Sequence, residues 1–360
     1  MKIKANKNDL IKSINTANKA VALKTTMPIL ECMLIIVEDD VRLMANNTEL
    51  GIETVLKAEI EEPGRVAIEA KILNDVIRKM PDGDITITAD ENSCTIKNGR
   101  SKFKLSVRDA SEYPYIEKID KTDPVNISQY ELKTVINQTI FSVAVNEANK
   151  MLTGVLFDVA GDKLNVVALD GHRVAIRHID LDKEYTNRSV VIPGKTLGEI
   201  AKILDDGFAS IYVSKNNIMF EFDDTVMVSR LIEGQYLDIS KLKNDNFNTT
   251  LTIDRDSLID CLDRSSLLIG VNDRKPIILT INDEGSGVSI VTNTGSMNES
   301  IDAKKNGEDI KIGINPRFVL DALKAIEDDT VHLYFINQKS PLYIRDDAET
   351  YEYIILPIQI

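Results

Sequence analysis

The feature that most constrains the fold is a pattern that occurs three times in the 360 residues, about 120 residues apart. Each copy has apolar residues at the i, i+3, i+4, i+7 spacing of one helix face, then an acidic turn, then the alternation typical of a strand. The last apolar residues of the three helices are Met80, Leu204 and Ile326, which are 124 and 122 positions apart. Such a period indicates a protein built from three similar structural units.

A second helix opens each copy, and strand-rich runs with central polar turns separate the two helices. Those runs have the pattern of β-hairpins. The six predicted helices span 7–22, 70–80, 129–141, 194–204, 254–268 and 315–326. We therefore expect the α+β fold class, with two helices packed on antiparallel sheets in each repeat. Polar, turn-rich segments end the first two repeats and predict three domains, 1–121, 122–245 and 246–360.

Composition excludes several classes of protein. No apolar run approaches the ~20 residues that a membrane-spanning helix needs, and the N-terminus lacks the apolar region of a secretion signal. Three cysteines, odd in number and far apart, fit a reducing compartment, so we expect a cytoplasmic protein. Three histidines and no cysteine pair at ligand spacing argue against a metal site, and no cofactor-binding motif is present.

The net charge of −14 hides an uneven distribution of charge. The six predicted helices contain thirteen Lys or Arg against nine Asp or Glu, so they carry about +4 and the rest of the chain about −18. Positive charge is therefore segregated onto the predicted helices, whereas the alternative is that Lys and Arg simply favour exposed helix positions. The helix at 254–268 carries −2 and does not follow the trend.

Six segments of the sequence, in their order along the repeat, carry a family resemblance. They are TMPIL (26–30), ALDGHRVAI (168–176), VIPGKTLGEIAKIL (191–204), IGINPRFVLDAL (312–323), SPLYI (340–344) and YIILPIQI (353–360). With the repeat, they resemble the bacterial sliding clamp family, the beta subunits of DNA polymerase III. The resemblance implies a head-to-tail homodimer that forms a six-domain ring, encircles double-stranded DNA without sequence specificity and tethers the replicative polymerase. It also implies a processivity subunit with no catalysis of its own.

Simple geometry is consistent with such a ring. Two chains with six helices each supply twelve helices around one circle. At an axis spacing of ~10 Å the circle has a diameter of ~38 Å. Subtracting a helix diameter of ~10 Å leaves a passage of roughly 28 Å, which admits a hydrated duplex.

The resemblance further implies a pocket for short peptides of the polymerase III alpha subunit, the clamp loader and other clamp-binding proteins. Its residues in the second repeat and the segment after it are Leu152, Leu169, Gly171, His172, Arg173, Val174, Leu237, Lys241 and Leu242. The third repeat adds Asn315, Phe318, Ser340, Pro341, Ile354, Leu356, Pro357, Ile358, Gln359 and Ile360. Leu169, Leu237 and Gln359–Ile360 depart from the residues frequent in the family, so the peptide preference is expected to differ. The alternative for the tail is a final core strand.

Positions that touch DNA in the family match Lys24, Asn146 and Lys150, although aromatic residues are common at position 150. With basic residues of the predicted helices, the DNA-facing set becomes Lys24, Arg78, Asn146, Lys150, Lys195 and Lys202. Solvated surface lysines are the alternative. The ring contact is expected to involve edge strands within 71–107 of one chain and 268–305 of the other.

Two other readings of the sequence stay open. His172 lies close in sequence to the carboxylate of Asp170, so it could act as a general base or a metal ligand. The sequence has no G-x-S-x-G motif and no Gly-rich phosphate loop to accompany it. A structural histidine is therefore the simpler interpretation. An acidic hydrolase with paired carboxylates and a protein-interaction scaffold without DNA are the alternative functions. Retention on circular but not on linear DNA separates a clamp from both.

Overall fold

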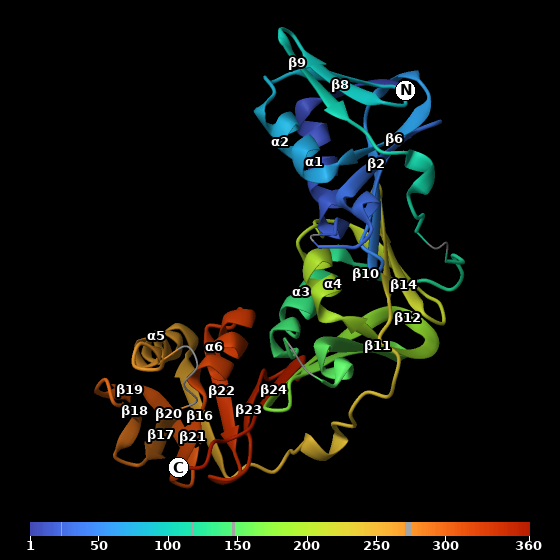
Figure 1. Ribbon diagram of the computed structural model, residues 1–360. Coiled ribbons are helices and arrows are strands. Elements are labelled where there is room, and N and C mark those ends of the chain that lie inside the picture. Colours follow the sequence, from blue (N-terminus) through green and yellow to red (C-terminus); the bar gives the residue numbers. More distant parts are fainter. Residues whose placement is uncertain (23, 117–118, 146–147, 271–274) are drawn as a thin grey trace. The chain divides into compact units, whose positions relative to one another are not determined.

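The computed structural model describes residues 1–22, 24–116, 119–145, 148–270 and 275–360. The chain divides into two compact units. Unit 1 comprises 1–130 with 202–231, and unit 2 comprises 131–201 with 232–360. In each unit helices pack on antiparallel sheets, which confirms the predicted α+β class (Figure 1).

Unit 1 contains two sheets (Figure 1). The five-stranded sheet has the order β5 (Glu59–Glu62), β1 (Lys2–Asn6), β7 (Asp84–Ala89), β8 (Ser93–Asn98) and β9 (Ser101–Ser106). The eight-stranded sheet has the order β10 (Val125–Ser128), β13 (Phe208–Val213), β14 (Asn217–Phe222), β15 (Thr225–Arg230), β4 (Leu50–Leu56), β3 (Val41–Asn46), β2 (Cys32–Val37) and β6 (Gly64–Glu69). Strands that are distant in sequence, β4 and β15, pair directly, so the sheet joins the first repeat to the second.

Two helices of unit 1, α1 (Lys7–Ala17) and α2 (Ala70–Lys79), pack against each other (Figure 1). Both were predicted, and α1 ends earlier than expected because a 3₁₀ turn, Asn18–Ala20, follows it. The apolar spacing predicts one buried stripe on each helix, and Leu10, Ile14 and Ala17 of α1 are buried, as are Leu73, Val76 and Ile77 of α2. The same spacing includes Ile72 in the stripe of α2, but that side chain is 40% exposed because its neighbour Leu73 takes the inward position.

Unit 2 also contains two sheets. The seven-stranded sheet has the order β11 (Gly154–Leu169), β12 (Arg173–Pro193), β24 (Tyr351–Ile355), β23 (Leu342–Arg345), β22 (Thr330–Phe335), β16 (Thr249–Asp254) and β20 (Ala303–Gly307). The four-stranded sheet has the order β19 (Ser296–Ile301), β18 (Gly285–Val291), β17 (Ile277–Asn282) and β21 (Ile310–Ile314). Here β12 of the second repeat pairs with β24 of the third.

The remaining four predicted helices are present with slightly shorter bounds. They are α3 (Gln129–Asn137), α4 (Gly194–Ala201), α5 (Arg255–Ser266) and α6 (Pro316–Ala325). A 3₁₀ turn, Ile140–Ser142, continues the segment predicted as the end of α3. Among the described residues, no helix combines the length and the apolar character that crossing a membrane requires.

The compact units do not coincide with the sequence repeats, because hydrogen-bonded strands join each repeat to the next. The ladder between β4 and β15 joins 202–231 of the second repeat to unit 1, which also contains the start of that repeat up to residue 130. The ladder between β12 and β24 joins 131–201 of the same repeat to unit 2. The domain spans 1–121, 122–245 and 246–360 therefore stay a prediction.

Candidate peptide-binding groove and nucleic-acid interface

The predicted pocket residues of β12 and β24 belong to one apolar cluster of unit 2. Its buried members are Val167, Leu169, Val174, Ile176, Tyr343 and Ile354. Leu152 and Leu242 pack against the cluster and are themselves only partly buried. In the register of the sheet, Val174 lies opposite Ile354, which lies opposite Tyr343 on β23. The cluster supplies apolar surface of the kind that buries anchor side chains of a ligand.

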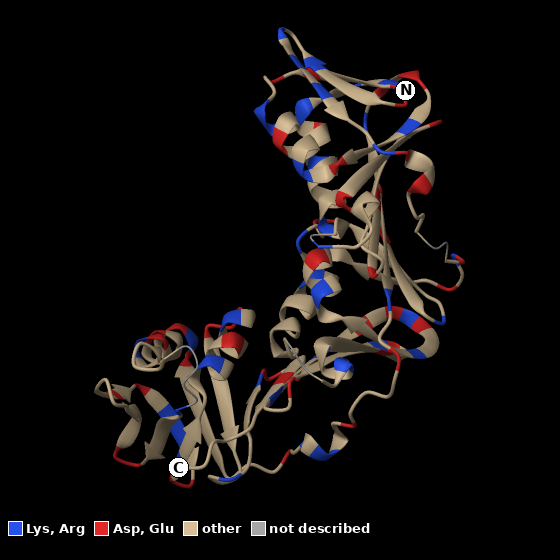
Figure 2. Cartoon of the chain, in the orientation of Figure 1, with Lys and Arg blue, Asp and Glu red and all other residues tan. Residues whose placement is uncertain are grey.

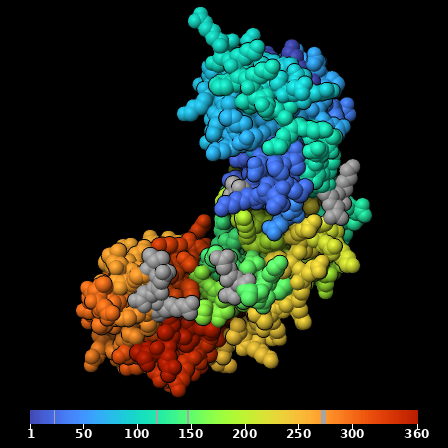
Figure 3. All heavy atoms as spheres, in the orientation of Figure 1, coloured from blue at the N-terminus to red at the C-terminus, as the bar shows by residue number. Residues whose placement is uncertain are grey.

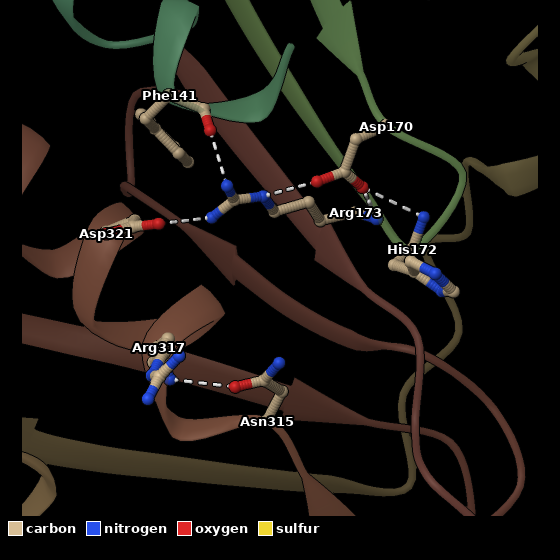
Figure 4. Close-up of polar contacts among 7 residues, drawn as sticks. All are labelled: Phe141, Asp170, His172, Arg173, Asn315, Arg317 and Asp321. Carbon is tan, nitrogen blue, oxygen red and sulfur yellow. Dashed lines mark hydrogen bonds and ion pairs between the residues drawn. The ribbon is translucent and has the colours of Figure 1, made fainter. Parts of the chain in front are cut away.

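A tight turn at 170–173 forms the polar edge of this cluster (Figure 4). The Asp170 carboxylate accepts hydrogen bonds from the backbone N–H groups of His172 at 3.0 Å and Arg173 at 3.1 Å. Gly171 has φ +85°, a left-handed conformation that costs glycine little. Asp170 is therefore occupied in holding the turn, which favours the structural reading of this cluster over a catalytic one.

Arg173 points away from solvent and connects three segments (Figure 4). Its side chain is 10% exposed, and its Nε donates to Asp170 Oδ2 at 3.0 Å. Its other nitrogens donate to the carboxylate of Asp321 on α6 and to the backbone oxygen of Phe141. The guanidinium also lies 4.6 Å from the ring centroid of Phe318. Arg173 thus fixes the turn and α6 relative to each other, and its donors are used inside the protein.

His172 and Phe318 lie together at the border of the cluster. Their rings are stacked, with centroids 6.2 Å apart and planes inclined by 18°. Asn315, predicted at the polar edge, caps α6 because its side-chain oxygen accepts a hydrogen bond from the N–H of Arg317 at 3.0 Å. The start of α6 is therefore held so that Phe318 remains half-buried beside His172.

The C-terminal tail after β24 is fixed at two points. The N–H of Leu356 donates to the backbone oxygen of His172 at 2.9 Å, and that of Ile358 donates to Gly313 at 2.8 Å. A Cβ at Gly313 would lie 2.5 Å from the Ile358 oxygen, so only glycine lets the tail approach β21. β24 is a buried core strand as far as Ile355, whereas Leu356 is 38% exposed and Ile360 is 65% exposed. The end of the chain lies at the surface of unit 2 (Figure 3).

The other predicted pocket residues lie around this core. Leu237 is 52% exposed, and Lys241 is fully on the surface. Ser340 closes a turn, in which its N–H donates to Asn337 Oδ1 at 3.0 Å. Pro341, Pro357 and Ile358 are half-buried, and Gln359 is exposed.

Several residues that hold the predicted pocket residues in place escaped the prediction. Asp321 holds Arg173, and Tyr236 fixes the segment before Leu237 because its hydroxyl lies 3.2 Å from the Gly154 oxygen and 3.3 Å from that of Val167. Burial raises the pKa of Tyr236, so the hydroxyl stays protonated and can donate. The alternation of apolar and polar residues along β11 predicts that Val167 is buried, but nothing in the sequence links Asp321 to Arg173.

The predicted DNA-facing residues are exposed where the structure describes them. Lys24, Arg78, Lys150, Lys195 and Lys202 are all on the surface. Asn146 lies outside the described residues. Figure 2 shows Lys and Arg gathered on α1 and α2, where Arg78 donates to Asn15 of the neighbouring helix at 2.8 Å. Within the described part of the chain, no group of three or more His, Cys, Asp and Glu is arranged to hold a metal ion.

Comparisons with known proteins agree along the whole chain. Models of the DNA polymerase III beta subunit match in consecutive order: the N-terminal domain at 1–117, the central domain at 126–238 and the C-terminal domain at 244–359. The chain is 32% identical to a beta sliding clamp of Staphylococcus aureus over 97% of both sequences. It is 30% identical to that of Bacillus subtilis over the full length of both.

Solved structures give the same result. A DNA polymerase III beta subunit from Eubacterium rectale matches with a TM-score of 0.95 and 44% identity over all of both chains. The sliding clamp of Bacillus subtilis matches with a TM-score of 0.96 and 30% identity, over 100% of this chain and 99% of that one. Family models, relatives and structures together show that the chain belongs to the bacterial DNA polymerase III beta subunits, the beta sliding clamps.

Proposed function

We propose that two copies of this chain join head to tail into a ring around duplex DNA and hold the replicative polymerase on its template. As a beta sliding clamp, the chain is a processivity subunit for replication and not an enzyme. The finer proposals concern the ring contact, the three domains 1–121, 122–245 and 246–360, and the two interaction surfaces.

The observation that carries the ring is the way in which consecutive repeats join. The last strand of one repeat pairs with an inner edge strand of the repeat before it, as β15 pairs with β4 and β24 pairs with β12. In the same strand order, β19 of the third repeat corresponds to β4, and β9 of the first repeat corresponds to β15. Both β9 and β19 end their sheets in the described part of the chain. Pairing β19 of one copy with β9 of the other repeats the internal junction and closes a two-fold ring.

Exposed side chains beside these strands are complementary. Next to β9, Phe103 is 41% and Ile72 is 40% exposed, and Lys102 and Lys104 are on the surface. In unit 2, Leu267 at the end of α5 is 84% exposed. The exposed acids of α5 are Asp256, Asp260 and Asp263. Basic and acidic surfaces of this kind favour the correct register of association. The acidic character of α5, which did not follow the charge of the other predicted helices, supports this proposed contact.

Cross-linking tests the ring contact. A chain with Lys104→Cys and Asn298→Cys should form a covalent dimer with a short bis-maleimide, because the two positions lie on β9 and β19. The three native cysteines are buried and should not compete. Lys215→Cys with Asn298→Cys is the matched control, since Lys215 is equally exposed but lies in the turn between β13 and β14. Equal cross-linking of the control, or a monomeric mass at all concentrations, would refute this contact.

The DNA-facing proposal rests on exposed basic residues of both units, Lys24, Arg78, Lys150, Lys195 and Lys202, with Asn146 added from the family resemblance. Encirclement needs only weak phosphate contacts, because topology retains the ring while counterion release supplies salt-dependent attraction. Retention of the loaded chain on circular DNA, and its loss when the circle is cut, is the decisive measurement. Equal retention on both forms would contradict encirclement.

The peptide-binding proposal rests on the apolar cluster and on the tail fixed beside it. Two buried aliphatic anchors are each worth roughly 1.5–3 kcal/mol, which is enough for micromolar affinity after the cost of association. Deleting Leu356–Ile360 removes one wall and should weaken a fluorescent peptide with one Gln and two apolar anchors by about tenfold or more. The dimer mass should not change. Equal affinity of both chains would place the pocket elsewhere.

A further inference from the structure

Unit 1 repeats the local arrangement that builds the groove of unit 2. Tyr113 is buried, and its hydroxyl lies 3.1 Å both from the Cys32 oxygen and from the Asn46 nitrogen. In unit 2 the Tyr236 hydroxyl contacts the backbone of β11 in the same way. Burial raises the pKa of both tyrosines. Each tyrosine therefore fixes the segment that follows it against its own sheet.

The residues after each tyrosine also correspond. Ile116 and Ile119 follow Tyr113 by three and six positions and pack on a buried cluster of unit 1. Ile239 and Leu242 follow Tyr236 by the same intervals and pack on the groove cluster of unit 2. Leu242 is one of the predicted pocket residues, so Ile119 takes the equivalent place in unit 1.

Strand register confirms the correspondence. In unit 2, Val174 of β12 lies opposite Ile354, which lies opposite Tyr343. In unit 1, Gly51 of β4 lies opposite Val228, which lies opposite Met219. Thus Val228 and Met219 occupy the positions that Ile354 and Tyr343 occupy in unit 2.

A cavity of about 590 Å³ lies at this place in unit 1. Its apolar lining includes Ile36, Met44, Val226, Val228 and Met219, with Tyr115 and Ile119 beside them. The volume falls within the range of small-ligand sites, and the lining has the apolar character that such sites share. Gly51 leaves room for Ile116, since a Cβ at Gly51 would lie 2.5 Å from that side chain. Ile116 lines the cavity there.

The charge at the rim separates this cavity from the groove of unit 2. The carboxylates of Glu38, Asp40 and Glu53 surround Arg42, with side chains 56%, 48% and 30% exposed. Lys121 is balanced by its ion pair with Glu221. Arg65 also lies here, where it donates to the Tyr115 hydroxyl at 2.8 Å. Three cations, Arg42, Lys121 and Arg65, thus stand against the four carboxylates of Glu38, Asp40, Glu53 and Glu221, which leaves an excess of one negative charge. A positively charged partner is therefore favoured at this rim.

We propose that this cavity is a second docking site, which takes a short linear peptide with two apolar side chains flanked by Lys or Arg. The apolar side chains occupy the lining around Val228 and Ile119, and the basic residues face Glu38 and Glu53. The assignment rests on the proposed peptide groove of unit 2, because the correspondence of register and linker is with that groove.

The test uses the full chain and a fluorescein-labelled octapeptide with adjacent Leu and Phe flanked by two Lys. The chain without Leu356–Ile360 is titrated in parallel, so that unit 1 is measured with the unit 2 groove impaired. We expect the truncated chain to retain saturable binding below about 1 mM. Ile119→Asp should weaken that binding at least tenfold. Tyr115→Ala, at a side chain 54% exposed, should also weaken it, whereas Tyr115→Phe keeps the ring and should not.

The charge of the rim is tested by replacing two of its carboxylates with amides of the same size. Glu38→Gln with Glu53→Gln should lower the affinity for the Lys peptide about fivefold at low salt. The same change should leave the affinity for a peptide with Glu in place of Lys unchanged, or raise it slightly. Unchanged affinities in Ile119→Asp and Tyr115→Ala, or no saturable binding by the truncated chain, would overturn the proposal.

Failure of the unit 2 groove gives a different pattern. If the groove of unit 2 does not bind peptides, the Gln-containing peptide should bind the full-length and truncated chains equally. The substitutions in unit 1 should still lower the affinity for the Lys peptide. Circular dichroism of each variant confirms that the chain is folded.

Discussion

Arg173 is the residue whose replacement tests the groove most directly. It joins the turn at 170–173, the backbone of Phe141 and the Asp321 carboxylate of α6, and it lies over the ring of Phe318. Arg173→Lys keeps the positive charge but replaces a planar fork of donors with a single ammonium group. The lysine cannot satisfy all three acceptors at once, so the turn and α6 lose their common attachment.

The size of the effect follows from burial. Hydrogen bonds from a charged donor are worth about 1.5–3 kcal/mol each when buried, which applies to Asp170 and to the Phe141 oxygen. Asp321 is 44% exposed, and its pair with Arg173 is discounted to about 0.2–1 kcal/mol. Stacking on Phe318 adds roughly 0.5–1 kcal/mol. Lysine retains one of these contacts, so we expect a loss of about 2–4 kcal/mol in the unfolding free energy of unit 2.

If the proposed groove binds peptides, affinity should fall as well, because Arg173 positions its residues while its own donors are used inside the protein. The turn that it holds presents the His172 oxygen that fixes Leu356, and the same guanidinium holds Phe318. We expect the dissociation constant of the Gln-containing peptide to rise about tenfold in Arg173→Lys, which is about 1.4 kcal/mol. Asp321→Asn should give roughly a threefold rise by the same route.

A double-mutant cycle distinguishes positioning from general destabilisation. Arg173→Lys, Asp321→Asn and the double variant are compared by fluorescence anisotropy, and their effects should be non-additive because both act through one contact. Asp263→Asn is the matched control, since Asp263 is an exposed acid of α5 paired with Lys324 of α6. Wild-type peptide affinity in Arg173→Lys, or additive effects of the two changes, would refute the reasoning.

Three further predictions concern the tail, the DNA surface and the buried thiols. Gly313→Ala should displace the tail, because its Cβ would lie 2.5 Å from the Ile358 oxygen; peptide affinity should fall about tenfold by anisotropy while the dimer mass stays unchanged. Replacing Lys24, Lys150, Lys195 and Lys202 by Glu should reduce loading onto circular DNA and its salt dependence without unfolding the chain, as a salt series of loading assays would show. Burial raises the pKa of Cys94 to about 12, so the folded chain keeps a thiol proton that the unfolded chain releases from about pH 9. The free energy of unfolding should therefore decline as the pH rises between these values, and denaturation curves should show a weaker pH dependence in Cys94→Ala.

The helices were predictable because their signal is local. The stripe of Leu73, Val76 and Ile77 follows from the period of the helix, and all three side chains are buried. Ile72 was misplaced because it lies next to the stripe in sequence and its hydrophobicity alone suggests burial. The proposed contact with a second copy of the chain would cover this side chain.

The pairing of strands across repeats could not be read from the sequence. Nothing in the residues around Gly51 names Val228 as its partner, since a strand specifies its alternation but not its neighbour. The same limit applied to the groove. Val174 and Ile354 were assigned from the family resemblance, whereas the attachment of Arg173 to Asp321 joins residues 148 positions apart and appears only in three dimensions.

The proposed ring contains three kinds of junction between neighbouring repeats, and they are not equal in strength. Those between β4 and β15 and between β12 and β24 lie within one chain. Each is accompanied by a connecting segment that a tyrosine, Tyr113 or Tyr236, fixes to the sheet. The proposed junction between β9 and β19 would repeat this strand pairing without a connecting segment, so its ladder and its side chains alone would hold it. Separating the two copies there exposes one strand edge on each side, whereas separating a junction within the chain also requires the tyrosine and its segment to leave the sheet. We therefore infer that loading onto DNA opens the contact between β9 and β19, and the cross-link between Lys104→Cys and Asn298→Cys should block loading while the control pair does not.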